Sequence, residues 1–333
     1  MRFAGVATIV LSFCIVCAGC TEEAKTAKTG TAPPGKKKYR IAVIPKGTTH
    51  DFWKSVHFGA QQAATELGDV EIIWNGPDKE TDKEGQIKIV DTFVGERVDG
   101  ICVAPIDRDA LVPAVRRSRQ RKIPVVVFDS ALSDLSDVVS YVATDNYRGG
   151  VMAAEQLAKL MEGKGGVVLL RYQAGSESTE QREQGFLDTL KKAPGIKVLS
   201  ESQRVNSDAV EALKVGESVL RSFKDEVAGV FTVCEPNNKG MLQALENEHL
   251  AGKVRFIAFD SDPRMLTGLR AHTVDGVVLQ NPVRMGYLAV KTMISHLQGE
   301  EVEKRIPTGE VLATPDNVND AEMRELLEPK QAG

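Results

Sequence analysis

The sequence predicts an α/β protein with two successive parallel sheets, each covered by helices on both faces. Three observations lead to this prediction. Short β-branched runs alternate with amphipathic segments of helical length from residue 39 to residue 298. The runs are apolar throughout, which is typical of strands buried on both faces of a parallel sheet. The 333 residues are also enough for two ordinary domains.

The first half begins with a predicted strand at 40–45 and a helix at 52–67. That helix places Trp53, Val56 and Ala60 on one face at three- and four-residue spacing, and Asp51 is its expected N-cap. The same alternation predicts further strands at 70–74, 100–104, 123–128 and 138–143, and further helices at 83–96 and 108–121.

The second half repeats this scheme without a sequence repeat of fixed period. Strands are predicted near 166–171, 196–200, 228–233, 254–259 and 276–280. Helices are predicted near 147–162, 179–192, 208–223, 237–248 and 263–270, and a last helix at 283–298.

Composition excludes several classes of function. A net charge of −4 gives no basic surface for nucleic acid, and the basic run from Lys36 to Arg40 is interpreted as a solvated spacer. The five cysteines lack paired C-x-x-C zinc spacing, so no metal site is expected. No cofactor is expected either.

The N-terminus is interpreted as a targeting segment. Arg2 precedes an apolar run at 3–16, which ends in Cys17-Ala18-Gly19-Cys20. This ending resembles a bacterial lipoprotein box, which implies lipidation of Cys20 after removal of a signal peptide. The alternative is an uncleaved membrane anchor, but the run is shorter than the ~20 residues that a spanning helix needs. Residues 21–38 are polar and predict a flexible tether.

Polar side chains follow the predicted strands, where open α/β sheets bind ligands. Asp129 and Asp260 can accept from hydroxyl groups, Arg182 can donate to them, and Phe52 and Trp53 offer flat apolar faces. Gln280 and Thr144 could complete such a site, and Lys46, His50, Asp107 and Cys234 also stand at strand ends. Other roles stay open: strand-end aspartates such as Asp145 and Asp262 can cap helices, Trp53 can belong to the core, and Arg182 can form a structural ion pair.

The order and spacing of these segments resemble the ribose-binding type of periplasmic sugar-binding protein over residues 39–310. The resemblance is carried by Thr49-His50-Asp51-Phe52-Trp53, Ile123–Asp129, Thr144–Gly150, Arg182 with Gly185-Phe186, Phe259-Asp260 and Gln280-Asn281-Pro282. It implies two lobes joined by a hinge with three crossovers: 39–144 with about 281–305, and 145–280 with about 306–320. Cys102 and Cys234 would lie in separate lobes, without a disulfide.

The resemblance also implies a role for each matched residue. Phe52 and Trp53 would sandwich a sugar, while Asp129, Arg182, Asp260 and Gln280 would bind its hydroxyls. The sequence departs from the family pattern at Lys46, His50, Ala104 and Cys234, and Lys46 leaves room for an acidic ligand.

The implied function is capture of a monosaccharide or similar polyol for an ABC importer, that is, a permease with its ATPase. The protein would be a monomeric, membrane-anchored lipoprotein of the periplasm or cell surface, and not an enzyme. Three alternatives are considered: a receptor component for chemotaxis or signalling, an extracytoplasmic enzyme acting on sugars, and a sugar-sensing repressor. The repressor would need a DNA-binding segment where this chain has the targeting segment.

Overall fold

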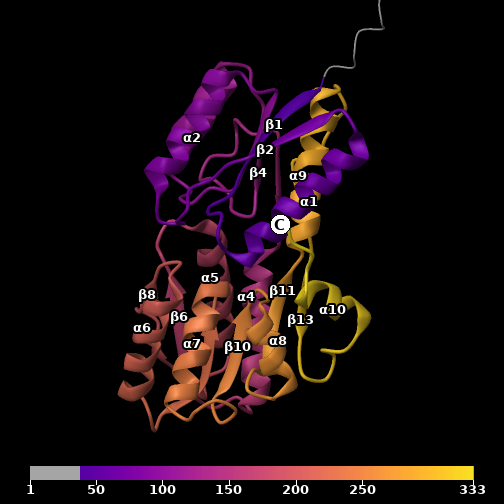
Figure 1. Cartoon of the computed structure of the whole chain (residues 1–333). Coiled ribbons are helices and arrows are strands. Elements are labelled where there is room, and N and C mark those ends of the chain that lie inside the picture. Colours follow the sequence, from indigo (N-terminus) through magenta and orange to yellow (C-terminus); the bar gives the residue numbers. More distant parts are fainter. Residues whose placement is uncertain (1–37, 333) are drawn as a thin grey trace, which may run out of the picture. The chain divides into compact units, whose positions relative to one another are not determined.

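Two sheets organise the part of the chain that the structure describes, a computed structural model of residues 38–332 (Figure 1). The predicted signal peptide, the Cys20 lipidation site and nearly all of the tether lie outside these residues. The first sheet has the order β12-β5-β4-β3-β1-β2, and every pairing in it is parallel. Its strands are β1 (Tyr39–Ile44), β2 (Val70–Trp74), β3 (Gly100–Val103), β4 (Val125–Phe128), β5 (Ser140–Ala143) and β12 (Arg305–Pro307).

The second sheet has the order β13-β11-β10-β9-β6-β7, with the short β8 paired to β6. It is parallel except for the edge strand β13, which runs antiparallel to β11. Its strands are β6 (Gly165–Tyr172), β7 (Ile196–Ser200), β8 (Arg204–Val205), β9 (Val227–Thr232), β10 (Arg255–Phe259), β11 (Gly276–Gln280) and β13 (Glu310–Ala313). The predicted fold class is therefore confirmed.

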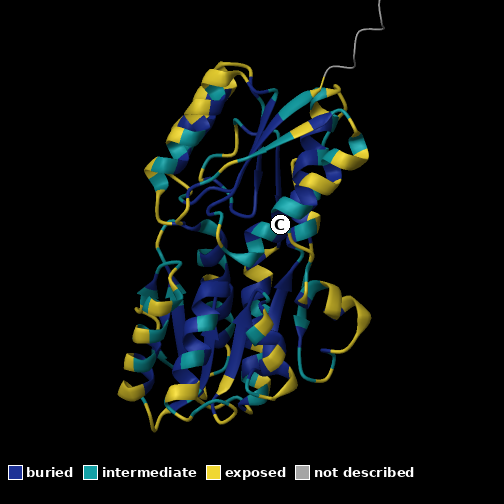
Figure 2. Ribbon diagram, viewed as in Figure 1, coloured by how far each residue is buried: buried dark blue, intermediate teal, exposed yellow. Residues whose placement is uncertain are grey.

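Helices cover both faces of each sheet, and the central strands between them are largely buried (Figure 2). β3 and β4, for example, expose none of their residues. The helices are α1 (Asp51–Leu67), α2 (Lys83–Glu96), α3 (Val112–Gln120), α4 (Asn146–Leu160), α5 (Glu177–Leu190), α6 (Ala209–Ser222), α7 (Glu235–Asn247), α8 (Pro263–Arg270), α9 (Pro282–Leu297) and α10 (Ala321–Leu327). No helix within residues 38–332 is long and apolar enough to cross a membrane.

The start of α1 corrects one expectation. Its N-cap is His50, without a capping side chain, and Asp51 is the first helical residue. Asp51 pairs instead with Lys54, 2.9 Å away. The expected caps do occur at Asp145, which accepts from the backbone N–H of Arg148, and at Asp262, which accepts from that of Arg264.

Glycines allow two pairs of helices to cross at very short range. A Cβ on Gly59 of α1 would lie 1.9 Å from the carbonyl oxygen of Val283 in α9. A Cβ on Gly150 of α4 would lie 2.0 Å from the carbonyl oxygen of Arg182 in α5. The first contact brings the late helix α9 back onto the first sheet, beside α1 (Figure 1).

The chain passes between the two sheets three times, after β5, after β11 and between β12 and β13. One buried residue from each passage joins a small hydrogen-bonded cluster: Thr144, Gln280 and Thr308. The Thr144 hydroxyl donates to Gln280 Oε1 at 2.7 Å and lies 3.3 Å from the Thr308 hydroxyl. These bonds tie the three connecting segments together beside the polar strand ends.

Candidate ligand-binding cleft

A cleft lies between the carboxyl ends of the two sheets, with walls from both lobes. The enclosed space measures about 40 Å³, room for about one or two water molecules. Nine of the predicted binding residues line it: Lys46, His50, Phe52, Trp53, Asp129, Arg182, Cys234, Asp260 and Gln280. Most of the residues that were predicted because they follow parallel strands therefore lie together in this cleft.

The structure places the other two predicted residues outside the cleft lining. Thr144 is buried behind it and holds Gln280 through the hydrogen bond described above. Asp107 lies in the turn before α3, where it accepts from the backbone N–H groups of Asp109 and Ala110 and pairs with Lys83. Its carboxylate is thus engaged in organising that turn.

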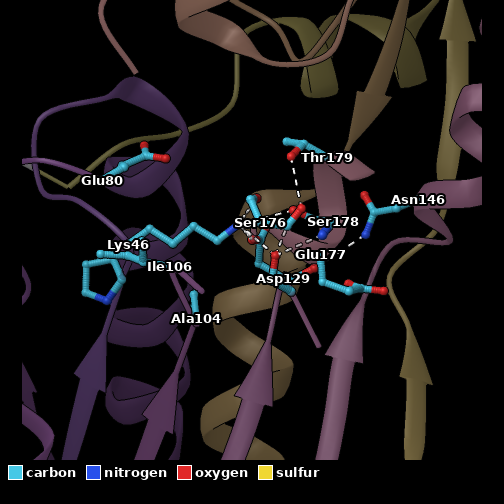
Figure 3. A network of polar contacts seen from close by, with 12 residues as sticks. Lys46, Glu80, Ala104, Ile106, Asp129, Asn146, Ser176, Glu177, Ser178 and Thr179 are labelled. Atoms are coloured by element: carbon cyan, nitrogen blue, oxygen red, sulfur yellow. Dashed lines mark hydrogen bonds and ion pairs between the residues drawn. The ribbon is translucent and has the colours of Figure 1, made fainter. Parts of the chain in front are cut away.

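Lys46 is a buried cation that connects the two lobes (Figure 3). Its Nζ lies 2.7 Å from Asp129 Oδ2 and 2.7 Å from the Ser130 hydroxyl, both on its own lobe. It also lies 3.3 Å from the Ser176 hydroxyl and 3.1 Å from the Ser178 hydroxyl, at the start of α5 in the other lobe. A buried ammonium needs a compensating charge and hydrogen bonds, and this network supplies both.

Glu80 is the centre of a second buried network. Its carboxylate accepts from the indole N–H of Trp53 at 2.7 Å and lies 2.7 Å from Nδ1 of His50. From the other lobe, the Tyr172 hydroxyl donates to it at 2.8 Å. Burial alone would raise the pKa of Glu80, but the hydrogen bond and charge of His50, with the charge of Lys46, lower that pKa to about 2.

The contact with Glu80 also shifts the pKa of His50. Burial alone would lower its pKa, but the hydrogen bond and charge of Glu80 outweigh burial and raise the pKa of His50. The pair therefore places a carboxylate on one wall of the cleft beside an imidazole whose protonated form the contact favours.

Arg182 and Asp260 form the opposite, second-lobe wall. The Arg182 guanidinium lies 3.6 Å from Asp260 Oδ2, donates to the Val233 carbonyl at 2.8 Å, and stacks 3.8 Å above the Phe259 ring. Gln280 donates to the other Asp260 oxygen at 2.7 Å. Burial raises the pKa of Asp260 to about 6, although Arg182 and Gln280 act in the opposite direction.

Asp129 and Asp260 occupy equivalent positions in the two lobes. Each follows a central strand, β4 or β10, and each has a positive φ, 64° for Asp129 and 75° for Asp260. The backbone N–H of each donates to the next strand, to Val142 at 3.0 Å and to Val278 at 2.9 Å. Aspartate tolerates this left-handed conformation better than most residues, and such strain is concentrated at functional sites.

The two aromatic residues are not equivalent. Trp53 is 3% exposed, packs against Phe128 and is held by Glu80, whereas Phe52 is only half-buried. Their rings meet edge to face with centroids 4.9 Å apart. Trp53 is therefore the member of the pair that packs inward, and Phe52 presents the more accessible ring.

Several lining residues were not predicted from the sequence: Glu80, Tyr172, Ser176, Ser178, Thr179, Glu235 and Pro236. The strand-end rule applied to β6 could have found Ser176 and Ser178, which follow it after a short turn. Glu80 lies in the loop between β2 and α2, as far beyond its strand as Ser178 lies beyond β6, so the same rule applied to β2 could have found it.

A family model for the periplasmic binding protein domain matches residues 41–301, most of the chain. The chain belongs to the periplasmic binding proteins. A carbohydrate transporter solute-binding protein from Agrobacterium radiobacter, solved in complex with D-arabinose, is 33% identical. It superposes with a TM-score of 0.84 over 87% of this chain and 99% of that one.

Two further relatives place this periplasmic binding protein among the solute-binding proteins of ABC transporters. One from Agrobacterium vitis, bound with α-D-tagatopyranose, is 30% identical, with a TM-score of 0.83 over 88% of this chain and all of that one. The ribose import binding protein of Escherichia coli is 29% identical over 275 residues, 81% of this chain and 88% of that protein. The resemblance inferred from the sequence is confirmed.

Proposed function

We propose that this periplasmic binding protein captures a monosaccharide or similar polyol in its cleft and delivers it to an ABC importer. The supporting observation is the composition of the cleft walls, where carboxylates and cations from both lobes line the cleft together with the half-buried Phe52. Hydroxyl groups both donate and accept, so a polyol can use carboxylate acceptors and guanidinium or ammonium donors at once.

The lobes would have to separate to admit a sugar, because the present space of about 40 Å³ is too small for one, and closure about the hinge would then enclose it. Direct bonds between the lobes support a closed arrangement, since Tyr172 reaches Glu80, and the backbone N–H of Phe52 donates to Glu235 at 3.1 Å. Within residues 38–332, no group of three or more His, Cys, Asp and Glu side chains could hold a metal ion.

The first experiment is a thermal-shift screen against pentoses, hexoses, polyols and sugar acids, followed by calorimetric titration of each compound that stabilises the protein. A ligand that binds only the native state raises its apparent stability. Neutral sugars are expected to stabilise, and failure of every sugar and polyol would overturn the proposal. Stabilisation by sugar acids alone would assign Lys46 to an anionic group of the ligand.

The site itself is tested with Phe52→Ala and a matched control, Phe58→Ala. Both residues are half-buried in α1, but only Phe52 lines the cleft. Loss of an aromatic face weakens ring binding by about tenfold or more, on the order of 1.5 kcal/mol. Equal affinities in the two variants would contradict the assignment of the cleft.

The proposed lipid anchor is tested separately with Cys20→Ser. We expect this variant to leave the membrane fraction when cells are fractionated, because the thiol of Cys20 would carry the lipid. If it stays with the membrane, the apolar segment at 3–16 itself is the anchor.

A further inference from the structure

A second chamber adjoins the cleft and is much larger. Its volume is about 380 Å³, against about 40 Å³ for the cleft, and it falls in the range of small-molecule sites, roughly 300–1,000 Å³. The two spaces share three lining residues, Phe52, Asp260 and Gln280. A molecule held in the cleft could therefore extend past these side chains into the chamber.

The C-terminal segment closes this chamber by crossing from one lobe to the other. After α10, which packs on β11, the Ser261 hydroxyl donates to the Leu327 carbonyl. Five residues later, the backbone N–H of Ala332 donates to the Lys54 carbonyl in α1, at 3.1 Å. Figure 1 shows the chain end beside α1. One wall of the chamber is supplied by Glu328, Pro329 and Gln331, which lie between these two bonds, together with Leu326 and Leu327.

The polar lining of the chamber is rich in acceptors. It includes the carboxylates of Asp51, Asp260, Asp262 and Glu328, and Arg270 is the one basic residue among the described residues that line it. Leu266, Leu326 and several prolines add apolar surface. Acceptors set among apolar surfaces suit a ring that carries hydroxyl donors on its edge and C–H groups on its faces. A carboxylate or phosphate would be repelled.

Asp262 supplies the most specific signal. The residue is 2% exposed, and its Oδ1 caps α8 by accepting from the N–H groups of Arg264 and Met265. Its Oδ2 has no hydrogen-bond partner within residues 38–332. The ammonium of Lys239 contributes charge nearby, but it donates to Glu235 at 2.6 Å. A buried acceptor without a donor is costly, and because Oδ2 is itself covered from solvent, a ligand donor would satisfy it only after a small movement of the chamber wall.

We propose that this chamber is a second subsite, which receives a neutral hydroxylated ring joined to the polyol in the cleft. The preferred ligand is then a disaccharide or glycoside rather than a free monosaccharide. The inference rests on the proposed function, because the cleft must hold the first ring.

The test fills the chamber by substituting a residue that lines the chamber but not the cleft. Thr267→Trp places a large side chain on the exposed face of α8, where Thr267 lines the chamber but not the cleft. Thr92→Trp is the matched control, since Thr92 is also an exposed helical threonine. Both hydroxyls donate to the carbonyl four residues earlier, Pro263 for Thr267 and Lys88 for Thr92.

Calorimetry should compare each monosaccharide that binds with disaccharides and glycosides containing it. We expect the wild type to bind the best disaccharide or glycoside at least about tenfold more tightly, the effect of one hydrogen bond to a charged group. Thr267→Trp should remove that gain and change monosaccharide affinity less than about twofold, while Thr92→Trp changes neither. Asp262→Asn, which keeps the helix cap, should also reduce the gain.

The outcomes separate the two proposals. If no sugar or polyol binds the wild type, the proposed function fails. If monosaccharides bind and no disaccharide or glycoside binds more tightly, the cleft stands and the second subsite is refuted. The second subsite would also be refuted if Thr267→Trp and Asp262→Asn both keep the full preference for the larger ligand. Their melting temperatures must match that of Thr92→Trp for this comparison.

Discussion

The Glu80 network allows a quantitative test by the substitution Glu80→Gln, which keeps the shape of the side chain and removes its charge. The pKa of Glu80 is lowered from its ordinary value of 4.5 to about 2. This difference corresponds to about 3 kcal/mol of native-state stability at pH 6. Because the folded-state pKa is the lower one, the contribution is complete above pH 4.5 and is lost as the pH falls through about 2.

Urea denaturation of the wild type and Glu80→Gln at two pH values measures this contribution. At pH 6, where the raised pKa of His50 keeps its ring largely protonated, the variant should lose about 3 kcal/mol of unfolding free energy. At pH 3 the loss should shrink to about 1 kcal/mol, since wild-type Glu80 then binds protons preferentially in the unfolded state.

A surface glutamate provides the control. Glu155 forms an exposed ion pair with Arg148 at 3.2 Å, so Glu155→Gln should change stability by less than about 1 kcal/mol at either pH. The reasoning is refuted if Glu80→Gln costs the same at pH 6 and pH 3, or if its cost at pH 6 equals that of the control.

Two further predictions concern Asp260 and the helix crossing. Asp260→Asn should stabilise the protein by up to about 3 kcal/mol at pH 8 and weaken sugar binding. Burial raises the pKa of Asp260 to about 6, so ionisation of this carboxyl destabilises the folded protein as the pH rises from 3.8 through about 6. Thermal melts in which the variant shows no gain at pH 8 would contradict this prediction. Gly59→Ala should destabilise by about 1–3 kcal/mol in denaturant titrations, because its Cβ would meet the Val283 carbonyl. Gly95→Ala in α2 should be neutral or stabilising by up to about 1 kcal/mol, since nothing lies within 4 Å of the added Cβ; equal effects of the two changes would argue against close packing.

Most of the helices and strands could be predicted, because each of these carries a strong local pattern. The helix predicted at 263–270, for example, coincides with α8, whose start is marked by Asp262 and Pro263. The C-terminal elements β12, β13 and α10 lacked such a signal. The short strands β12 and β13 are only partly buried and are defined by pairing with β5 and β11, far away in the sequence.

The binding residues were predictable where they obey the topology of parallel sheets, as Asp129 and Asp260 do. The hydrogen-bond partners within the cleft were not predictable from the sequence. The bond from Tyr172 to Glu80, for example, joins residues 92 positions apart on different lobes. The same limitation applies to Asp107, which stands at a strand end like the others but turns its carboxylate to Lys83 and the local backbone.

The left-handed backbone at Asp129 and Asp260 has a consequence for how this protein would change under selection. A non-glycine residue in this conformation costs about 1–2 kcal/mol, so glycine at either position would relax the chain. In a library selected for heat resistance alone, without sugar, Asp260 should be among the first residues lost, whereas Asp129 should persist because it neutralises the buried ammonium of Lys46 at 2.7 Å. Persistence of Asp260 under such selection would indicate that it serves the fold itself and not only the cleft.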